Sequence, residues 1–365
     1  MIIKEHRIAQ SLFEDQDYVV ELKTTMRFRG DAMLSNILRK MRTPGDDRSE
    51  LRLTEEEWRA LQNTDVANGA SLEGTEMWYQ SAFAWSYVCM AQWNRSMESA
   101  KITEETLFLY AAKDYITNVD SRDFIAVRDK LLKTPNMNAT GRLPAVLLMH
   151  VKMRVRCTVT VCREQAPVDT MATVQSIELH AHDRSRWEQH RSDAVFVSHH
   201  APTVLVMIDD NHLDTGLGPG IIAVHTHLSE PFSIEVELND PRCAGARCLK
   251  VRAQREQVPL TIMTASTLYT LQGTTAEPGL IYYFRTPRRL SNVMKWVSCY
   301  MALSRVRTLR ELRSVGLTPA IRELIDEGPP DGFLTRFLKV FDDKILQTQT
   351  DIEEVLAELG WSTAD

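Results

Sequence analysis

The chain has 365 residues and a formal net charge of −6, with 44% hydrophobic and 25% charged residues. This composition is typical of a soluble globular protein with two or three domains and excludes a polycation, so nucleic-acid binding would depend on a local basic patch. No apolar run reaches the roughly 18 residues of a membrane span, and no signal peptide begins at Met1. Six cysteines are few for this length, which indicates a reducing compartment.

The first part of the chain predicts a mixed α/β structure. We expect a short strand at 17–22 (DYVVEL) and a helix over 31–42 (DAMLSNILRKMR), where apolar residues recur every three or four positions. In TEEEWRAL, Thr54 is followed three residues later by Glu57, which is the signature of a capping box at the start of a helix.

Two apolar stretches follow. We expect a helix over 77–95, whose aromatic side chains surround the helix and are therefore assigned to the core; a stacking platform is the alternative. The run TLFLYAA (106–112) is β-prone and precedes a polar helical segment, which predicts a βα unit of a buried parallel sheet.

The pattern changes near Gly141. VKMRVRCTVTV (151–161) alternates apolar and polar residues, which predicts a half-buried antiparallel strand with Lys152, Arg154 and Arg156 on its polar face. Short β-rich runs continue to about residue 252 and predict a small β-barrel or sandwich inserted into the α/β domain. A parallel-sheet pattern resumes at VPLTIMTAST (258–267), and helices are expected at the C-terminal end.

Two patterns resemble functional motifs but have simpler interpretations. TVLVMIDD (203–210) has the form of a magnesium-binding Walker B strand; we favour a barrel strand ending in a turn, because the sequence contains no Gly-Lys-Ser/Thr of a Walker A motif. The pairs His180/His182 and His225/His227 would each share a face of a strand and could chelate zinc. We expect no metal there, because no compact set of four ligands is apparent.

The stretch LQGTTAEPGL begins at Leu271, after an apolar strand. A strand that breaks at Gly273, between Gln272 and Thr274, lets backbone amides approach a phosphate or a nucleic-acid backbone. An ordinary strand-ending turn would have the same sequence.

A basic region follows in the acidic chain. Between Arg285 and Arg313, eight Lys/Arg residues accompany one acid, Glu311, which predicts a patch that attracts phosphates. YMALSRVRTLREL is expected to present arginines on a helix; a solvated helix face is the alternative for Arg307, Arg310 and Arg313.

These stretches carry a resemblance to the PIF-type superfamily 1 DNA helicases and their Helitron-like relatives. TASTLYTLQGTT resembles motif V, YMALSRVRTL resembles motif VI, and VELKTTMRFRGD resembles motif IV. The resemblance covers nearly the whole chain and implies an α/β fold: the second RecA-like domain, interrupted by a small antiparallel β-barrel, with a helical C-terminal tail. The implied boundaries are 1–142 and 254–317 for the two RecA-like segments, 143–253 for the barrel and 318–365 for the tail.

The resemblance also implies a function: the C-terminal portion of an ATP-dependent 5′-to-3′ DNA helicase. Arg305 is then the arginine finger and Arg27 its companion, while Gln272 and Gly273 couple the nucleotide to the DNA groove. The implied nucleic-acid contacts are Thr267, Tyr269, Thr274, Thr275, Lys152, Arg154 and Arg156. Tyr269, Thr270 and Leu271 replace the family's His-Lys-Ser, so we expect Tyr269 to stack on a base.

The implied partners are single-stranded DNA and a first RecA-like domain, upstream or in trans, and no membrane. ATP and Mg²⁺ belong to the complete helicase; we expect neither to bind this chain tightly alone, because Walker A and Walker B are missing from it. The family further implies roles in DNA repair, recombination and telomere maintenance, in the nucleus of a eukaryote or otherwise in the cytoplasm.

Two other functions remain open at the level of sequence. One is a non-hydrolytic module that binds single-stranded nucleic acid or a protein through the barrel. The other, weaker one is an unrelated zinc-binding β protein. A truncated gene or an element remnant would also account for a chain that resembles half of a helicase.

Overall fold

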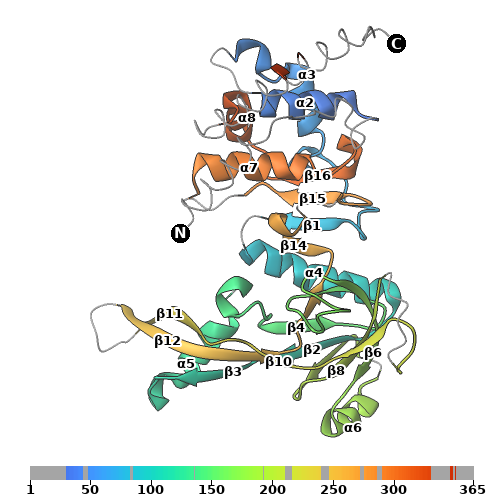
Figure 1. Ribbon diagram of the computed structural model, residues 1–365, viewed down its shortest axis with the longest axis vertical. Helices are drawn as coiled ribbons and strands as arrows, with labels where there is room; N and C mark the ends of the chain where they lie inside the picture. Colours follow the sequence, from blue (N-terminus) through green and yellow to red (C-terminus); the bar gives the residue numbers. More distant parts are fainter. Residues whose placement is uncertain are drawn as a thin grey trace. The chain divides into compact units, whose positions relative to one another are not determined.

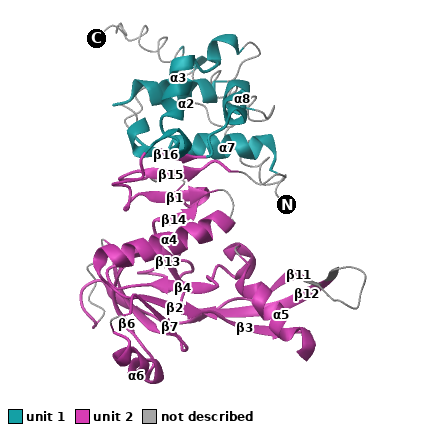
Figure 2. Ribbon diagram, turned by 180° about the vertical axis from the view of Figure 1, so that it is seen from behind, with its two compact units in different colours: residues 1–70, 288–312, 316–365 teal, residues 71–287, 313–315 magenta. Residues whose placement is uncertain are grey.

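The computed structural model (Figure 1) describes residues 30–43, 48–82, 85–134, 136–191, 193–209, 216–239, 246–271, 275–285, 290–329, 346–347 and 350. The chain divides into two compact units (Figure 2). Unit 1 comprises residues 1–70, 288–312 and 316–365, and unit 2 comprises residues 71–287 and 313–315. The strand predicted at 17–22 lies outside the described residues.

Unit 1 contains α2 (Ala32–Arg42), α3 (Glu55–Gln62), α7 (Asn292–Leu303) and α8 (Pro319–Glu327). The predicted helix over 31–42 is confirmed: Asp31 caps α2 by accepting a hydrogen bond from the Leu34 N–H, and α2 packs against α3, α7 and α8. The capping box of α3 is also confirmed, with both reciprocal hydrogen bonds between Thr54 and Glu57 formed.

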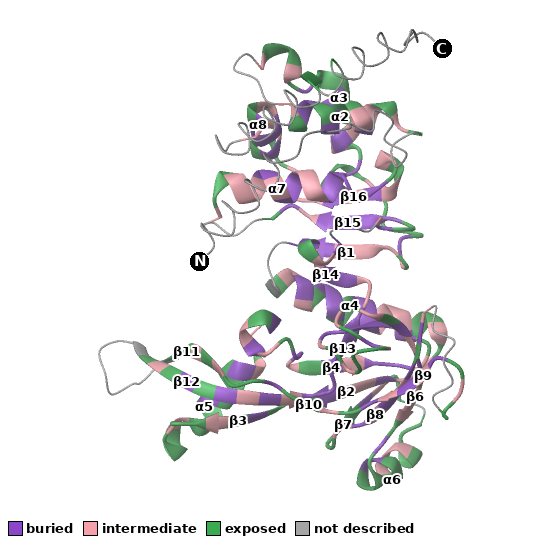
Figure 3. Ribbon diagram, viewed as in Figure 1, coloured by how far each residue is buried: buried purple, intermediate pink, exposed green. Residues whose placement is uncertain are grey.

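A parallel sheet lies in unit 2, with the strand order β14-β1-β15-β16. Its strands are β1 (Tyr79–Ala82), β14 (Ala265–Thr267), β15 (Leu280–Tyr283) and β16 (Leu312–Val315). The central strand β1 pairs in parallel with both β14 and β15, and β15 is buried along most of its length (Figure 3).

The helix predicted over 77–95 is wrong in its first part, because residues 79–82 form β1 and the helix α4 spans Trp85–Thr103. An apolar run of this kind suits a buried strand as well as a buried helix, and pairing with two neighbouring strands decides in favour of the strand. Helix α4 then packs against β1 and β14.

A five-stranded antiparallel sheet has the order β13-β5-β6-β8-β9. Its strands are β5 (Arg154–Cys157), β6 (Met171–Glu178), β8 (Thr203–Ile208), β9 (Ile221–Val224) and β13 (Leu260–Ile262). The candidate Walker B stretch is thus an antiparallel strand, β8, and not part of the parallel sheet.

The strand predicted over 151–161 is much shorter in the structure. Lys152 adopts a left-handed backbone conformation with φ 70°, which turns the chain before β5 begins. After Cys157 the chain leaves the regular ladder, and the Thr158 N–H donates to the carbonyl of Pro259. The alternation predicted the correct strand type but not its ends.

Two further sheets complete the β-rich part of unit 2. One has the order β4-β2-β7, and in the other β12 pairs with β10, β11 and β3. Their bounds are β2 (Leu107–Ala111), β3 (Lys113–Thr117), β4 (Val146–Met149), β7 (Val195–Ser198), β10 (His227–Leu228), β11 (Phe232–Asn239) and β12 (Ala246–Gln257).

The βα unit predicted at 106–112 is wrong. The strand β2 forms, but β3 follows it directly, and β2 pairs antiparallel with β4 and parallel with β7, outside the parallel sheet of β1. Likewise VPLTIMTAST is divided at Met263 and Thr264 between β13 in the antiparallel sheet and β14 in the parallel one.

One hydrophobic core joins these parts of unit 2, running from Ala91 on α4 through β4, β5, β6, β8, β9 and β13 to Ala265 on β14. A second, smaller core lies between α5 (Ser121–Leu132) and the strands β11 and β12.

The remaining helix, α6 (Ala181–Gln189), precedes β7. Among the described helices, none is both long and apolar enough to cross a membrane.

Candidate nucleic-acid interface

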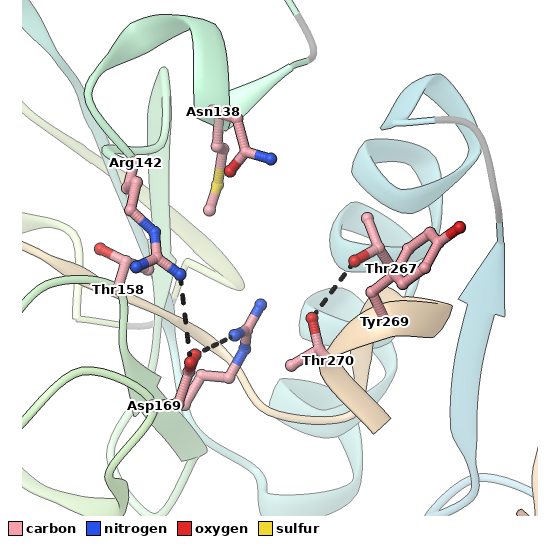
Figure 4. A pocket seen from close by; sticks show the side chains of 9 residues that line it. Asn138, Arg142, Thr158, Asp169, Thr267, Tyr269 and Thr270 are labelled. Carbon is pink, nitrogen blue, oxygen red and sulfur yellow. Dashed lines mark hydrogen bonds and ion pairs between the residues drawn. The ribbon is translucent and has the colours of Figure 1, made fainter. Parts of the chain in front are cut away.

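A pocket of about 210 Å³ lies in unit 2 beside the end of β14 (Figure 4). Three parts of the chain form it: the short helix η4 (Met137–Thr140) with the turn after it, the end of β5 with the loop before β6, and the segment from β14 into η5 (Leu268–Leu271). The lining residues are Met137, Asn138, Arg142, Arg156, Thr158, Asp169, Thr267, Tyr269 and Thr270.

The motif V-like segment supplies the hydroxyl groups of the pocket. Strand β14 ends at Thr267, and the buried side chains of Leu268 and Leu271 anchor the turn that follows. Thr267 and Thr270 form a hydrogen bond between their hydroxyl oxygens, 3.2 Å apart, while Tyr269 is 42% exposed. Partial burial raises the pKa of Tyr269, so its hydroxyl stays neutral at physiological pH.

The opposite wall is cationic. Arg156 on β5 is buried and donates from Nη1 to Asp169 Oδ1 at 2.7 Å, and Arg142 Nη2 lies 4.0 Å from Asp169 Oδ2 (Figure 4). Burial lowers the pKa of Arg156, whereas the Asp169 carboxylate raises it. Since a guanidinium titrates far above neutral pH, Arg156 remains charged.

Two buried polar atoms of this wall have no hydrogen-bond partner among the described residues: Arg156 Nε and Thr158 Oγ1. Buried donors are nearly always satisfied in folded proteins, so two such atoms in one wall need an explanation. Arg142 and Asp169 also adopt left-handed backbone conformations, with φ of 63° and 68°. Such conformations in residues other than glycine are enriched at functional sites.

The three predicted basic contacts of the β5 region have different surroundings. Of the three, Arg156 lines the pocket, but it is buried rather than exposed on a polar face, which corrects the prediction. Arg154 forms a two-pronged ion pair with Asp209 and also donates to Thr173, and the exposed Lys152 pairs with Glu105 at 2.7 Å. These contacts arise because loops distant in sequence bring carboxylates to the strand.

The structure describes only some of the nucleic-acid contacts predicted for the motif V-like stretch. Thr267 and Tyr269 line the pocket, and Thr275 is half-buried without lining it. Gln272, Gly273 and Thr274 lie outside the described residues, as does Arg27 of the motif IV-like stretch.

The arginines of the motif VI-like stretch do not share a helix, so that prediction is wrong. Helix α7 ends at Leu303 with Ser304 as its C-cap; Arg305 follows in a turn, and its Nε and Nη2 donate to Ser304 Oγ at 3.2 and 2.9 Å. Arg310 belongs to η6 (Leu309–Glu311), and Arg313 on β16 lies over the Trp78 ring at 5.0 Å. The cap ends the helix one residue before the proposed finger.

Sequence reasoning did not identify Asp169, Arg142 or Asn138 as pocket residues. The alternation over 151–161 puts Thr158 on the same polar face as Arg156, but the residue follows β5 and its hydroxyl is buried. Asp169 lies in an irregular loop, where no periodic pattern marks its position. Only the change of pattern near Gly141 pointed to the neighbourhood of Arg142.

His180 and His182 do not form the strand pair considered above. His180 is the N-cap of α6, and its ring stacks on those of His182 and His200, with centroids 5.3 and 4.3 Å apart. Within the described parts of the chain, no group of three or more His, Cys, Asp or Glu residues is arranged to hold a metal ion.

No protein-family model and no curated protein sequence matches the chain. Solved structures of Pif1 helicases do match. The Candida albicans Pif1 helicase matches with a TM-score of 0.50 and 15% identity over 87% of this chain and 60% of that one. Bacteroides Pif1 bound to single-stranded DNA matches with a TM-score of 0.52 and 15% identity over 90% and 57%.

A third structure, Pif1 helicase from Bacteroides in complex with ADP-AlF3 and single-stranded DNA, matches with a TM-score of 0.52 and 15% identity over 89% of this chain and 57% of that one. At this identity the likeness shows the fold alone. The chain therefore has a Pif1-like helicase fold and spans somewhat more than half the length of these neighbours.

Proposed function

We propose that the chain is the second RecA-like half of an ATP-dependent DNA helicase and that the pocket beside Tyr269 lies on its path for single-stranded DNA. The observation that carries this proposal is the pocket itself. Arg156 and the motif V-like pair Thr267 and Tyr269 are far apart in sequence, were each expected to contact nucleic acid, and line one cavity. The single-stranded DNA in two of the similar Pif1 structures supports the same conclusion.

In this proposal the parallel sheet of β14, β1, β15 and β16 is the RecA-like core. The insert extends from β2 to β13, longer at both ends than the predicted 143–253, because β2, β3 and β13 pair within the β-rich sheets. It contains the proposed barrel, and α8 would be the first helix of the extension expected from residue 318.

Arg305 is the proposed arginine finger. Its side chain is partly exposed just beyond α7. Its Nε and Nη2 donate to the Ser304 hydroxyl, which orients this edge of the guanidinium. ATP bound to a first RecA-like domain would supply the phosphoryl group, and the role of Arg305 would be to stabilise the charge that develops on it. This role fits a chain whose sequence has no Gly-Lys-Ser/Thr.

The test joins the chain to a compatible first RecA-like domain and measures ATP turnover. Arg305→Ala should lower turnover by about three to five orders of magnitude, as losses of arginine fingers do, with a much smaller effect on ATP affinity. Arg305→Lys should not restore full activity, because an ammonium cannot reproduce the planar fork. Arg310→Ala, at an exposed position in η6, is the matched control. Equal losses in the two alanine variants would refute the assignment of Arg305.

A second candidate function is a module that binds single-stranded nucleic acid without hydrolysis. It is favoured by the fact that all lining residues of the pocket belong to unit 2, whereas Arg305 belongs to unit 1. DNA binding by the chain, combined with no ATP turnover in any joined protein, would select this function over the helicase.

A further inference from the structure

The guanidinium of Arg156 is unusually short of hydrogen bonds for a buried group. The residue is 7% exposed, and within the described structure it makes one hydrogen bond, from Nη1 to Asp169. A guanidinium carries five N–H donors in a planar fork. Among the described residues, neither its buried Nε nor the buried Thr158 Oγ1 in the same wall has a hydrogen-bond partner.

The charge of the pocket favours an anion. Its charged lining residues are Arg142, Arg156 and Asp169, so two positive charges and one negative charge leave a net charge of +1. The negative charge belongs to Asp169, whose side chain is half-exposed, so its carboxylate can turn to water when another anion takes its place on Arg156. The Thr267 and Thr270 hydroxyls line the same space and can reorient as donors.

The size of the pocket limits the ligand. About 210 Å³ is below the roughly 300 Å³ at which pockets begin to enclose a drug-sized molecule, so a whole nucleotide does not fit inside. One phosphate group does. Tyr269, partly exposed at the edge of the pocket, presents a ring on which an attached base could stack.

We propose that this pocket is a phosphate subsite, which binds one phosphodiester of a single DNA strand in place of the Asp169 carboxylate. The N–H groups of Arg156 that the described residues leave unused donate charge-assisted hydrogen bonds to the incoming phosphate oxygens, and Arg142 donates from the solvent side. The identity of the ligand, single-stranded DNA, rests on the proposed function. The binding itself would come from Arg142 and Arg156 and does not require ATP hydrolysis.

The experiment measures the affinity of the full chain for a fluorescein-labelled oligodeoxythymidylate by anisotropy over a range of salt concentrations. Arg156→Gln should weaken binding by on the order of tenfold and should reduce the magnitude of the salt slope by about 0.7, the value for one phosphate contact on a single strand. Asp169→Asn should have the opposite effect and tighten binding, because it removes the competing charge, and asparagine tolerates the left-handed backbone at this position.

The matched control is Arg128→Gln, which removes one positive charge from an exposed position of α5 in the same unit. It should change the affinity little. Thermal unfolding of each variant shows whether it is folded, and Asp169→Asn decides the question if Arg156→Gln does not fold.

The outcomes separate the two proposals. If the unmodified chain binds the oligonucleotide and neither pocket variant changes its affinity, the subsite is refuted and the proposed function stands. If the unmodified chain does not bind it at all, the proposed function fails as well. A titration with inorganic phosphate, followed by ³¹P NMR, covers the remaining case: phosphate bound through Arg156, with unchanged oligonucleotide affinity, would assign the pocket to a free anion and overturn the role in strand binding.

Discussion

Two buried arginines of unit 2 differ in how completely they are satisfied. Arg255 on β12 is fully buried and donates through Nε and Nη2 to both oxygens of Asp114, at 2.7 and 2.9 Å. Its remaining donors reach the carbonyls of Leu131 at 3.0 Å and Leu143 at 3.5 Å. Arg156 on β5 is 7% exposed, has one described hydrogen bond, and its Nε has no described partner.

This difference distinguishes a structural arginine from one suited to binding. Arg255 joins β3, β12, the end of α5 and the turn after η4, and every nitrogen has a partner, so it offers nothing to a ligand. Arg156 faces a pocket and shares its carboxylate with Arg142. The same residue type, at similar burial, thus stabilises the fold in one place and leaves donors available in the other.

The largest expected effect is on stability at the Arg255 pair. Asp114→Ala should lower the free energy of unfolding by about 3–5 kcal/mol, because it leaves a fully buried guanidinium charge unpaired. Urea unfolding measures the loss. Asp120→Ala, which breaks an ion pair whose side chains are about two-thirds exposed, is the control and should cost at most about 1 kcal/mol. Similar losses in the two variants would mean that Arg255 has no special structural role.

Asp183 on α6 is a buried carboxylate that, like the side chain of Arg255, has several hydrogen-bond partners. Burial alone would raise the pKa of Asp183, but hydrogen bonds from the backbone N–H groups of His200 and His199 and from the Ser198 hydroxyl outweigh it and hold the pKa well below its usual value. Arg186 and the His200 ring also contact the carboxylate. Asp183→Asn should therefore cost about 1–3 kcal/mol near neutral pH.

The pH dependence of this effect has a definite sign. Because the folded pKa of Asp183 is depressed, its stabilisation is fully present above the unfolded pKa of about 3.9 and is lost as the pH falls below it. The difference in unfolding free energy between the original chain and Asp183→Asn should shrink below about pH 4. Asp193→Asn, at an exposed aspartate, is the control. A difference that grows on acidification would contradict this assignment.

The smallest change in stability is expected for replacing Arg156, the incompletely hydrogen-bonded arginine, with methionine. Arg156→Met should change the free energy of unfolding by less than about 1 kcal/mol, or even stabilise the chain, because it removes an incompletely paired buried charge and leaves Asp169 half-exposed to water. Arg255→Met should be clearly destabilising, since it strands the buried Asp114. A cost for Arg156→Met as large as that for Arg255→Met would make Arg156 a structural residue.

Local signals made much of the fold predictable. The capping box of α3 and the apolar spacing of α2 depend on residues within one or two helical turns, and both were correct. The short β-rich runs that became β6, β8, β9 and β11 were also recognisable as strands. Two of the errors concern pairing between distant segments: β1 was interpreted as helix, and β2 was assigned to a parallel sheet that it does not join.

Only part of the pocket could be predicted, because local sequence signals mark some of its residues and the others approach only on folding. Thr267 and Tyr269 follow a recognisable strand and carry the helicase resemblance, so their position could be inferred. The burial of Arg156 could not, because it depends on Asp169 and on the turn at Arg142, which approach β5 only in the folded chain. Sequence alternation shows which face a residue occupies, but not what covers that face.

The most direct test of the central claim, that the chain contains the strand-binding half of a helicase, is its affinity for single-stranded DNA as a function of salt. We expect a dissociation constant on the order of 10⁻⁴ to 10⁻⁶ M at physiological salt, a steep loss of affinity as salt rises, and little sequence preference. An affinity that does not change with salt, binding to one sequence only, or no binding at low salt would contradict it.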